Sequence, residues 1–285
     1  MNVKTRIKIM VICAHPDDAE LLAGGLAIKL ISHNHQVKFI SVTNGNLGHH
    51  KMNPLETAKT RQKEALNSAK ILGTEYTSLN VNDGHIYVNR ELTEKIVRII
   101  RNYDPDLILT HRVNDYHRDH RYCGQLVMDA NNMLIVPHYC PDTPISKTRK
   151  QPVICYLYDH FLKPYPFIPN ILLDITDVFD QKAKALICHK SQMMEWLPWT
   201  QKLEHLIPKE FDDNIRKKMV EMIITMMFSH ILIDYQELWN KGFPGRKIQY
   251  GEAFEISEYG RQPTLKELKT FFPGAYIPSK QDLKG

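Results

Sequence analysis

Short apolar runs alternate with amphipathic stretches along the first half of the chain, and this order constrains the fold more than any other feature. Four apolar runs fit strands, at residues 7–13, 37–43, 76–81 and 106–110. Helical patterns follow the first three, at residues 17–34, about 56–72 and 91–103. Such βαβα order predicts a parallel sheet with helices on both faces and right-handed crossovers. We therefore expect an α/β fold of the Rossmann-like, doubly wound type with a mostly parallel sheet.

The pattern loosens after Pro137. Two more runs fit strands and one long stretch fits a helix, at residues 151–158, 170–176 and 177–196. The chain then reads as mostly helical to about residue 240, and the Met-rich stretch 219–228 reads as helix core. No repeat or low-complexity linker divides it. We predict one domain over residues 1–285, with a core at about 5–195 and a helical C-terminal elaboration at about 196–285.

The composition is that of an ordinary globular protein. Hydrophobic residues make up 43% and charged residues 24% of 285 residues. The net charge of +5 is spread along the chain, so nothing indicates a nucleic-acid partner. The number of cysteines, five, is odd, and no two of them have C-x-x-C spacing. Both features favour reduced thiols in a cytoplasmic protein. No apolar run reaches the roughly 18 residues that a membrane span needs.

The stretch "ICAHPDDAELLAGG" (12–25) sets polar residues where the first strand ends. His15, Asp17, Asp18 and Glu20 stand close together there. A helix start uses one acidic residue as a cap, whereas two adjacent bare carboxylates repel each other. A cation would remove that repulsion, so this stretch indicates a cation site.

A second polar cluster, "THRVNDYHRDHRYCG" (110–124), follows the fourth strand. It holds His111, Asp115, His117, Asp119 and His120. In the doubly wound strand order 3-2-1-4-5, strands 1 and 4 are neighbours, and the crevice outside their carboxyl ends binds ligands. We therefore expect the two clusters to meet at one site.

The residue types in these clusters suit zinc. Catalytic zinc takes three nitrogen or oxygen ligands from the protein and keeps one position open for water. Two histidines and one aspartate would complete such a set. A neighbouring aspartate could then act as general base, because zinc-bound water titrates near neutrality.

The same residues carry a family resemblance. "AHPDDAE" followed by "HRDH" resembles the LmbE-like, or PIG-L, family of metal-dependent N-acetylglucosamine deacetylases. Four more segments agree with that family in order, at residues 61–73, 82–86, 172–192 and 251–254. The resemblance covers roughly residues 7–256. It implies an enzyme that removes an acetyl group from an N-acetylated amino sugar or glycoconjugate.

The resemblance assigns the metal ligands to His15, Asp18 and His120. The metal it implies is Zn²⁺, with another divalent metal such as Fe²⁺ as the alternative. Two positions beside the H-x-D-H motif depart from the family pattern. Arg118 stands where proline is frequent, and Tyr116 stands where arginine or glycine is frequent. These departures leave the ligands intact and change the rim, and so the substrate.

The resemblance also assigns the catalytic roles. Asp17 matches the general base. A protonated His117 would polarise the carbonyl oxygen or protonate the leaving amine, and Asp119 would orient His117. Arg61 lies in the family-like helix, where it would contact the substrate. His189 is expected to pack close to the site.

The substrate rim is expected at residues 44–55, 138–150 and 195–203. Trp196 and Trp199 could stack on a sugar or pack among the C-terminal helices. Two other functions stay open: a metal-dependent phosphoesterase, which would usually need carboxylates for two metals, and a non-catalytic sugar-binding protein on the same scaffold. The expected partner is a small molecule.

Overall fold

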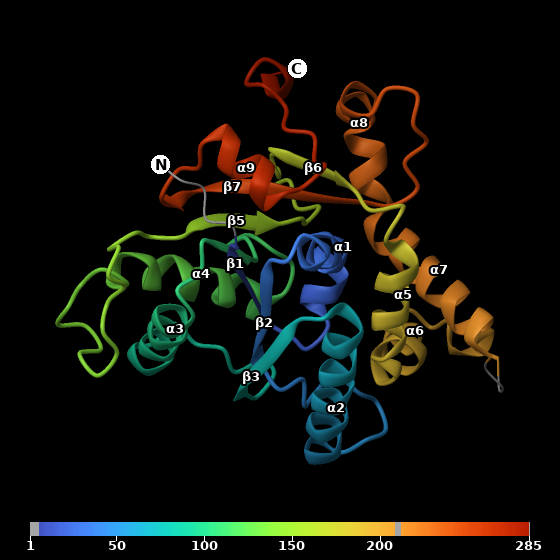
Figure 1. The fold of residues 1–285 in the computed structure, drawn as a ribbon. Coiled ribbons are helices and arrows are strands. Elements are labelled where there is room, and N and C mark those ends of the chain that lie inside the picture. The colour runs from blue at the N-terminus through green and yellow to red at the C-terminus, as the bar shows by residue number, and fades with distance from the viewer. Residues whose placement is uncertain (1–5, 209–211, 285) are drawn as a thin grey trace.

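The core of the protein is one seven-stranded sheet. The computed structural model describes residues 6–208 and 212–284 (Figure 1). Its strands are β1 (Lys8–Cys13), β2 (Gln36–Thr43), β3 (Glu75–Val81), β4 (Leu107–Thr110), β5 (Val153–Leu157), β6 (Ile171–Asp174) and β7 (Gly251–Gly260). The order across the sheet is β3-β2-β1-β4-β5-β7-β6. Strands β1 to β5 pair in parallel, and β7 runs antiparallel to both β5 and β6. The α/β class and the order 3-2-1-4-5 are confirmed.

Helices cover both faces of the sheet (Figure 1). They are α1 (Asp18–Ser32), α2 (Pro54–Leu72), α3 (Arg90–Tyr103), α4 (Arg118–Met133), α5 (Phe179–Ile187), α6 (Leu197–Thr200), α7 (Asp213–Asp234), α8 (Gln236–Gly242) and α9 (Leu265–Phe271). Successive residues of β1 alternate between two cores, as strand geometry requires. Ile9 and Val11 join the core on the side of α1 and α5, and Met10 and Ile12 join the core on the side of α3 and α4.

Local sequence signals set the ends of the helices. Asn53 caps α2 by accepting the backbone N–H of Glu56, and Pro54 occupies the first turn, where its missing N–H costs nothing. Gly73 ends the helix with a φ of 77°, a left-handed conformation that glycine adopts without strain. These signals agree with the predicted helix at about 56–72.

The single helix predicted over 177–196 is wrong, because the structure interrupts it. Helix α5 ends at Ile187, and a π-helix runs from Ser191 to Trp196. The carboxylate of Glu64, on α2, accepts both the backbone N–H and the Oγ–H of Ser191, at 2.8 and 2.6 Å. A side chain thus takes the donor that a continuous helix would have used internally.

Strand β7 lies inside the segment for which we predicted a helical elaboration. It inserts between β5 and β6, so the C-terminal part completes the core sheet. The strand carries buried acidic residues, which a core strand rarely does. Glu252 pairs with Lys182 at 2.8 Å and accepts two backbone N–H groups of α1. These contacts compensate the buried negative charge of Glu252. The strand was not predicted because its acidic residues do not fit the pattern of a core strand.

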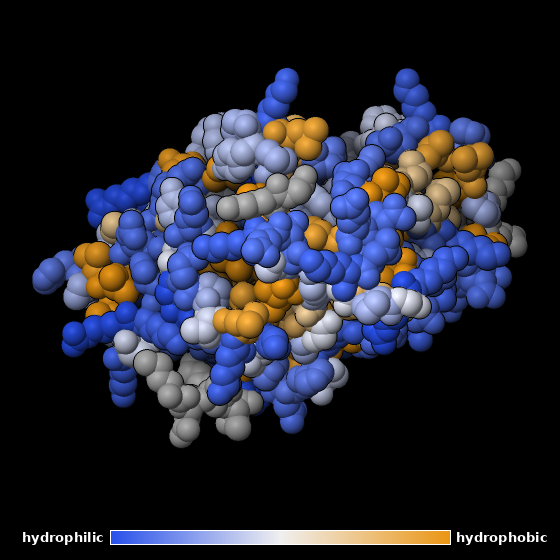
Figure 2. All heavy atoms as spheres, turned by 90° about the horizontal axis from the view of Figure 1, so that it is seen from above, coloured by the Kyte–Doolittle hydropathy of each residue, from blue (hydrophilic) through white to orange (hydrophobic). Residues whose placement is uncertain are grey.

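The face seen from above carries mainly hydrophilic side chains, with hydrophobic ones in scattered groups between them (Figure 2). Among the described residues, none of the helices combines the length and the apolar character that crossing a bilayer requires.

Candidate active site

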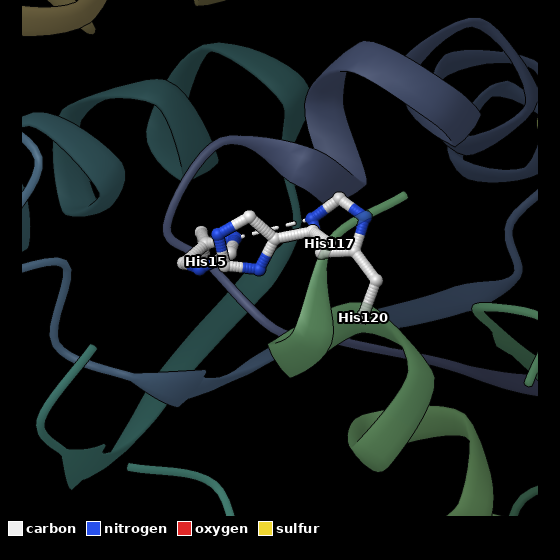
Figure 3. A group of neighbouring side chains, drawn as sticks. All are labelled: His15, His117 and His120. Atoms are coloured by element: carbon white, nitrogen blue, oxygen red, sulfur yellow. Dashed lines mark hydrogen bonds between the residues drawn. The ribbon is translucent and has the colours of Figure 1, made fainter. Parts of the chain in front are cut away.

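The two polar clusters meet where β1 and β4 end. These strands are paired in parallel, with Ile12 opposite Thr110. His15 follows β1, whereas His117 precedes α4 and His120 lies in its first turn. The imidazoles of His15, His117 and His120 turn toward one another (Figure 3). The expected meeting of the clusters at the switch point is what the structure shows.

The three predicted ligands form a triangle of donor atoms. His15 Nδ1 lies 3.2 Å from His120 Nε2 and 3.3 Å from Asp18 Oδ2. Asp18 Oδ2 lies 3.5 Å from His120 Nε2. A tetrahedral zinc with bonds of about 2.0–2.2 Å separates neighbouring ligand atoms by about 3.3–3.6 Å. Donor types and spacing therefore both fit a zinc ion.

The charges around the triangle also suit a cation. Burial lowers the pKa of His15, but the carboxylates of Asp18 and Asp119 outweigh burial and raise that pKa to about 10. The same balance, with Asp18 and Asp115, raises the pKa of His120 to about 9. A pocket that stabilises protons on its imidazoles would also stabilise a metal ion in place of those protons.

Carboxylates lie beside the outer nitrogens of the two predicted histidine ligands. His120 Nδ1 lies 3.0 Å from Asp115 Oδ1, and His15 Nε2 lies 3.7 Å from Asp119 Oδ2. Partners of this kind fix the orientation of a ligating imidazole and raise its basicity. The backbone N–H of Gly84 donates to the same oxygen of Asp119 at 2.6 Å.

The carboxylate of Asp119 therefore lies beside a different histidine from the one expected. Its carboxylate faces His15, and only its backbone N–H contacts His117, donating to Nδ1 at 3.1 Å. His117 is the N-cap residue of α4, so its ring accepts the free N–H at the start of the helix. The sequence motif shows the spacing of these residues but not which atom of Asp119 faces which ring.

The surroundings of His117 favour its neutral form, whereas the resemblance implied a protonated ring. Burial and the positive charges of His15 and His120 lower the pKa of His117 to about 4. Because Nδ1 accepts a backbone N–H, the proton of the neutral ring resides on Nε2. His117 thus presents an N–H donor beside the ligand triangle, with its ring centroid 4.7 Å from that of His15.

Asp17 and Arg61 form a buried pair behind the ligands. Arg61 Nη2 lies 2.8 Å from Asp17 Oδ1 and also donates to the carbonyl of Pro16 at 3.2 Å. Burial raises the pKa of Asp17, Arg61 partly opposes it, and the net pKa is above the ordinary value. Such a shift moves a carboxylate toward the range in which a general base works.

Arg61 contacts Asp17 and is itself almost fully buried. Only 3% of its surface is exposed. The predicted substrate contact of Arg61 stays a prediction.

Two more buried histidines border the site. His111 Nε2 lies 3.3 Å from the carboxylate of Asp18. The same nitrogen accepts the backbone N–H of Ala14 at 3.2 Å, so its lone pair is not free to bind a metal. His189 Nε2 lies 3.2 Å from Glu20, behind Asp17, where we expected it to pack.

A cavity of about 800 Å³ opens onto the metal-ligand triangle. Its polar end includes Asp18, His117 and His120, and residues of the 196–203 segment line another wall. Trp196 lines the cavity and stacks on Trp199, with ring centroids 5.2 Å apart.

The predicted rim is only partly correct. No described residue of 44–55 or 138–150 lines the cavity. The carbonyls of Tyr139, Cys140 and Thr143 instead accept hydrogen bonds from Arg101, which draws that segment toward α3. Helix α7, which we read as core, supplies a wall.

Comparisons with known proteins show which family the chain belongs to. The family described as PIG-L, GlcNAc-PI de-N-acetylase, matches residues 10–131. An uncharacterized deacetylase of Escherichia coli, YaiS, is 30% identical over 201 residues, covering 67% of this chain and 94% of its own length. The chain belongs to the PIG-L family. The residues that match this PIG-L family include both polar clusters.

Other PIG-L relatives differ in the reaction that their names state. The diacetylchitobiose deacetylase of Thermococcus kodakarensis is 29% identical over 204 residues, covering 67% of this chain and 73% of that protein. The 4-oxalmesaconate hydratase of Pseudomonas putida is 23% identical over 199 residues, covering 67% and 76%. The solved structure of N,N'-diacetylchitobiose deacetylase from Pyrococcus horikoshii superposes with a TM-score of 0.64 at 25% identity, covering 88% of this chain and 83% of that one.

Proposed function

We propose that this protein is a metal-dependent amide hydrolase that removes the acetyl group from an N-acetylglucosamine-type amino sugar or glycoconjugate. The observation that carries the proposal is the triangle of His15, Asp18 and His120 donor atoms, 3.2 to 3.5 Å apart, with the buried carboxylate of Asp17 beside it. Its deacetylase relatives support the reaction class.

The metal would be held by His15, Asp18 and His120, and zinc suits this donor set. Bound zinc supplies a Lewis acid for the acyl carbonyl and lowers the pKa of water to about 7. Asp115 and Asp119 would keep the two imidazoles in the ligating orientation through the contacts described above.

Asp17 and His117 would handle the protons. Asp17 accepts a proton from the water that attacks the carbonyl carbon, and Arg61 holds its carboxylate in place. His117 Nε2–H donates to the carbonyl oxygen as negative charge develops there. The proton taken by Asp17 then reaches the nitrogen as the C–N bond breaks. Acetate and a free amine leave.

The test is acetate release from purified, metal-quantified protein. N-acetylglucosamine, its glycosides and diacetylchitobiose are offered in turn, with and without a chelator. Acetate that appears from one of these and stops on chelation supports the proposal. Active-site zinc near one per chain without acetate from any of them contradicts it.

A hydratase is the second candidate, because one relative carries that name. Oxalmesaconate is a polycarboxylate, and anionic substrates are typically held by arginine or lysine. The described residues that line the cavity include neither. The same observation counts against a phosphoesterase. Incubation with an unsaturated polycarboxylate, followed by loss of its absorbance, separates the hydratase from the deacetylase.

We also propose that the chain forms one domain and works in the cytoplasm. The C-terminal β7 pairs with β5 in the core sheet, which supports one domain. The five cysteines are all free, which supports a reducing compartment.

A further inference from the structure

We propose that the cavity binds an alkyl or aryl group of the substrate, so that the preferred substrates are N-acyl amino sugars with an apolar substituent. The inference rests on the proposed function and names the substrate class of the same site. The binding surface consists of three methionines of α7, Met222, Met226 and Met227, and the apolar residues of the 196–203 segment, Trp196, Leu197, Pro198 and Leu203. We call it the apolar wall.

Helix α7 has more apolar surface than it buries in the core. One face packs into the core and includes Met219, Val220, Ile223, Ile224 and Ile231. Met222, Met226 and Met227 of the same helix stay 37%, 50% and 37% exposed. These three methionines line the cavity. A surface helix usually turns polar side chains outward, so three methionines left this exposed need another explanation.

The apolar wall is continuous with the catalytic centre. The cavity that it lines also includes Asp18, His117 and His120. Tyr116 and Phe161 lie along the same cavity, with nearly parallel rings 6.4 Å apart. A substrate whose acyl carbonyl reaches the metal ligands therefore has an apolar surface within reach of its remaining groups.

The chemistry of the wall selects among substrates. Sugar hydroxyls buried against methionine and leucine would lose their hydrogen bonds to water without replacement. An alkyl or aryl group has no hydrogen bonds to water that burial would break, and methionine side chains adapt to its shape. No arginine or lysine is among the described lining residues, so an anionic substituent lacks a partner. A neutral apolar substituent is the group that fits the apolar wall.

The experiment compares two substrate series. One consists of methyl, butyl and octyl β-glycosides of N-acetylglucosamine, and the other of glucosamine with N-acetyl, N-butyryl or N-octanoyl groups. We expect kcat/KM to rise along one series by about fourfold for each buried methylene. The series that responds identifies whether the apolar group is the aglycone or the acyl chain.

Two variants locate the effect. Met226→Gln should lower several-fold the ratio of kcat/KM for the longest compound to that for the shortest compound in the series that responds. Ile233→Gln changes an apolar residue of the same helix that is 65% exposed and lies outside the cavity, and it should leave that ratio unchanged. An unchanged ratio in Met226→Gln would overturn the proposal. So would a dimeric wild-type protein that Met226→Gln converts to monomers with the ratio intact, because a second copy would then cover the wall.

Binding separates this inference from the proposed function. Calorimetry compares octyl and methyl glycosides of N-acetylglucosamine, below micelle-forming concentrations, on the zinc-loaded protein. Tighter octyl binding without hydrolysis of any compound would support the apolar wall and contradict the deacetylase. Hydrolysis with no preference in either series would contradict the apolar wall alone. Absence of both preference and hydrolysis would overturn both.

Discussion

The guanidinium of Arg61 stands 2.8 Å from the carboxylate of Asp17, and both side chains are buried beside the metal-ligand triangle. An arginine in this place does two things. It holds the carboxylate in one orientation, and it opposes the burial that would otherwise keep the carboxyl protonated. The pair makes Arg61 a positioning residue for the proposed base.

Replacing Arg61 tests this relationship. Arg61→Met should lower kcat on the order of 10²-fold, because Asp17 loses its orientation, while KM and zinc content change little. Arg61→Lys should recover part of the rate. Steady-state kinetics with metal analysis checks the prediction. A large rise in KM at a retained kcat would instead support the substrate contact predicted from the sequence.

Substitutions of the two adjacent aspartates should differ in their effects on turnover and on zinc content. Asp17→Asn keeps the shape of the side chain and removes the base, so turnover should fall by about 10²- to 10⁴-fold with zinc retained. Asp18→Ala removes a ligand and should lose zinc as well. Zinc content and acetate release are measured on both proteins. Equal loss of metal in the two variants would contradict the division of roles.

The contact between Asp115 and His120 predicts an effect on metal affinity. Asp115→Asn weakens the partner that orients His120 Nδ1, so zinc should bind about 10- to 100-fold more weakly. Competition with a chromophoric chelator measures the affinity. Asp142→Asn, at an exposed aspartate that pairs with Arg98 outside the site, is the control. Equal affinities in the two variants would mean that Asp115 does not support the ligand.

The sheet and the location of the site were predictable because they follow from chain order. Short apolar runs and the polar residues after strands 1 and 4 place His15 and His120 together once the doubly wound order is assumed. The structure pairs Ile12 with Thr110, and the two histidines meet just beyond that pair. No side-chain detail is needed for this step.

Side-chain directions were not predictable, because motif spacing leaves them open. The H-x-D-H motif does not show that the carboxylate of Asp119 faces His15 rather than His117. The helical pattern around Arg61 gave no sign that its guanidinium turns inward to Asp17. In α7, the apolar residues around Met226 look the same in sequence whether they face the core or a cavity.

The metal-free protein should lose stability as the pH rises. The folded-state pKa values of His15 and His120, about 10 and about 9, lie above the ordinary histidine value of 6.5. Groups with raised pKa values stabilise the fold fully below the unfolded value, and that contribution disappears as the pH rises through the folded values. The Tm of chelator-treated protein should therefore fall between pH 7 and pH 10, and less steeply in His15→Gln.

The stabilisation that zinc gives should increase with pH, because the metal binds the neutral imidazoles and competes with their protons. The difference in Tm between zinc-loaded and metal-free protein should therefore widen from pH 6.5 to pH 10. Thermal scans of both forms in matched buffers measure that difference. Two curves that stay parallel over this range would mean that zinc does not displace protons from His15 and His120, and the proposed ligand set would then be wrong.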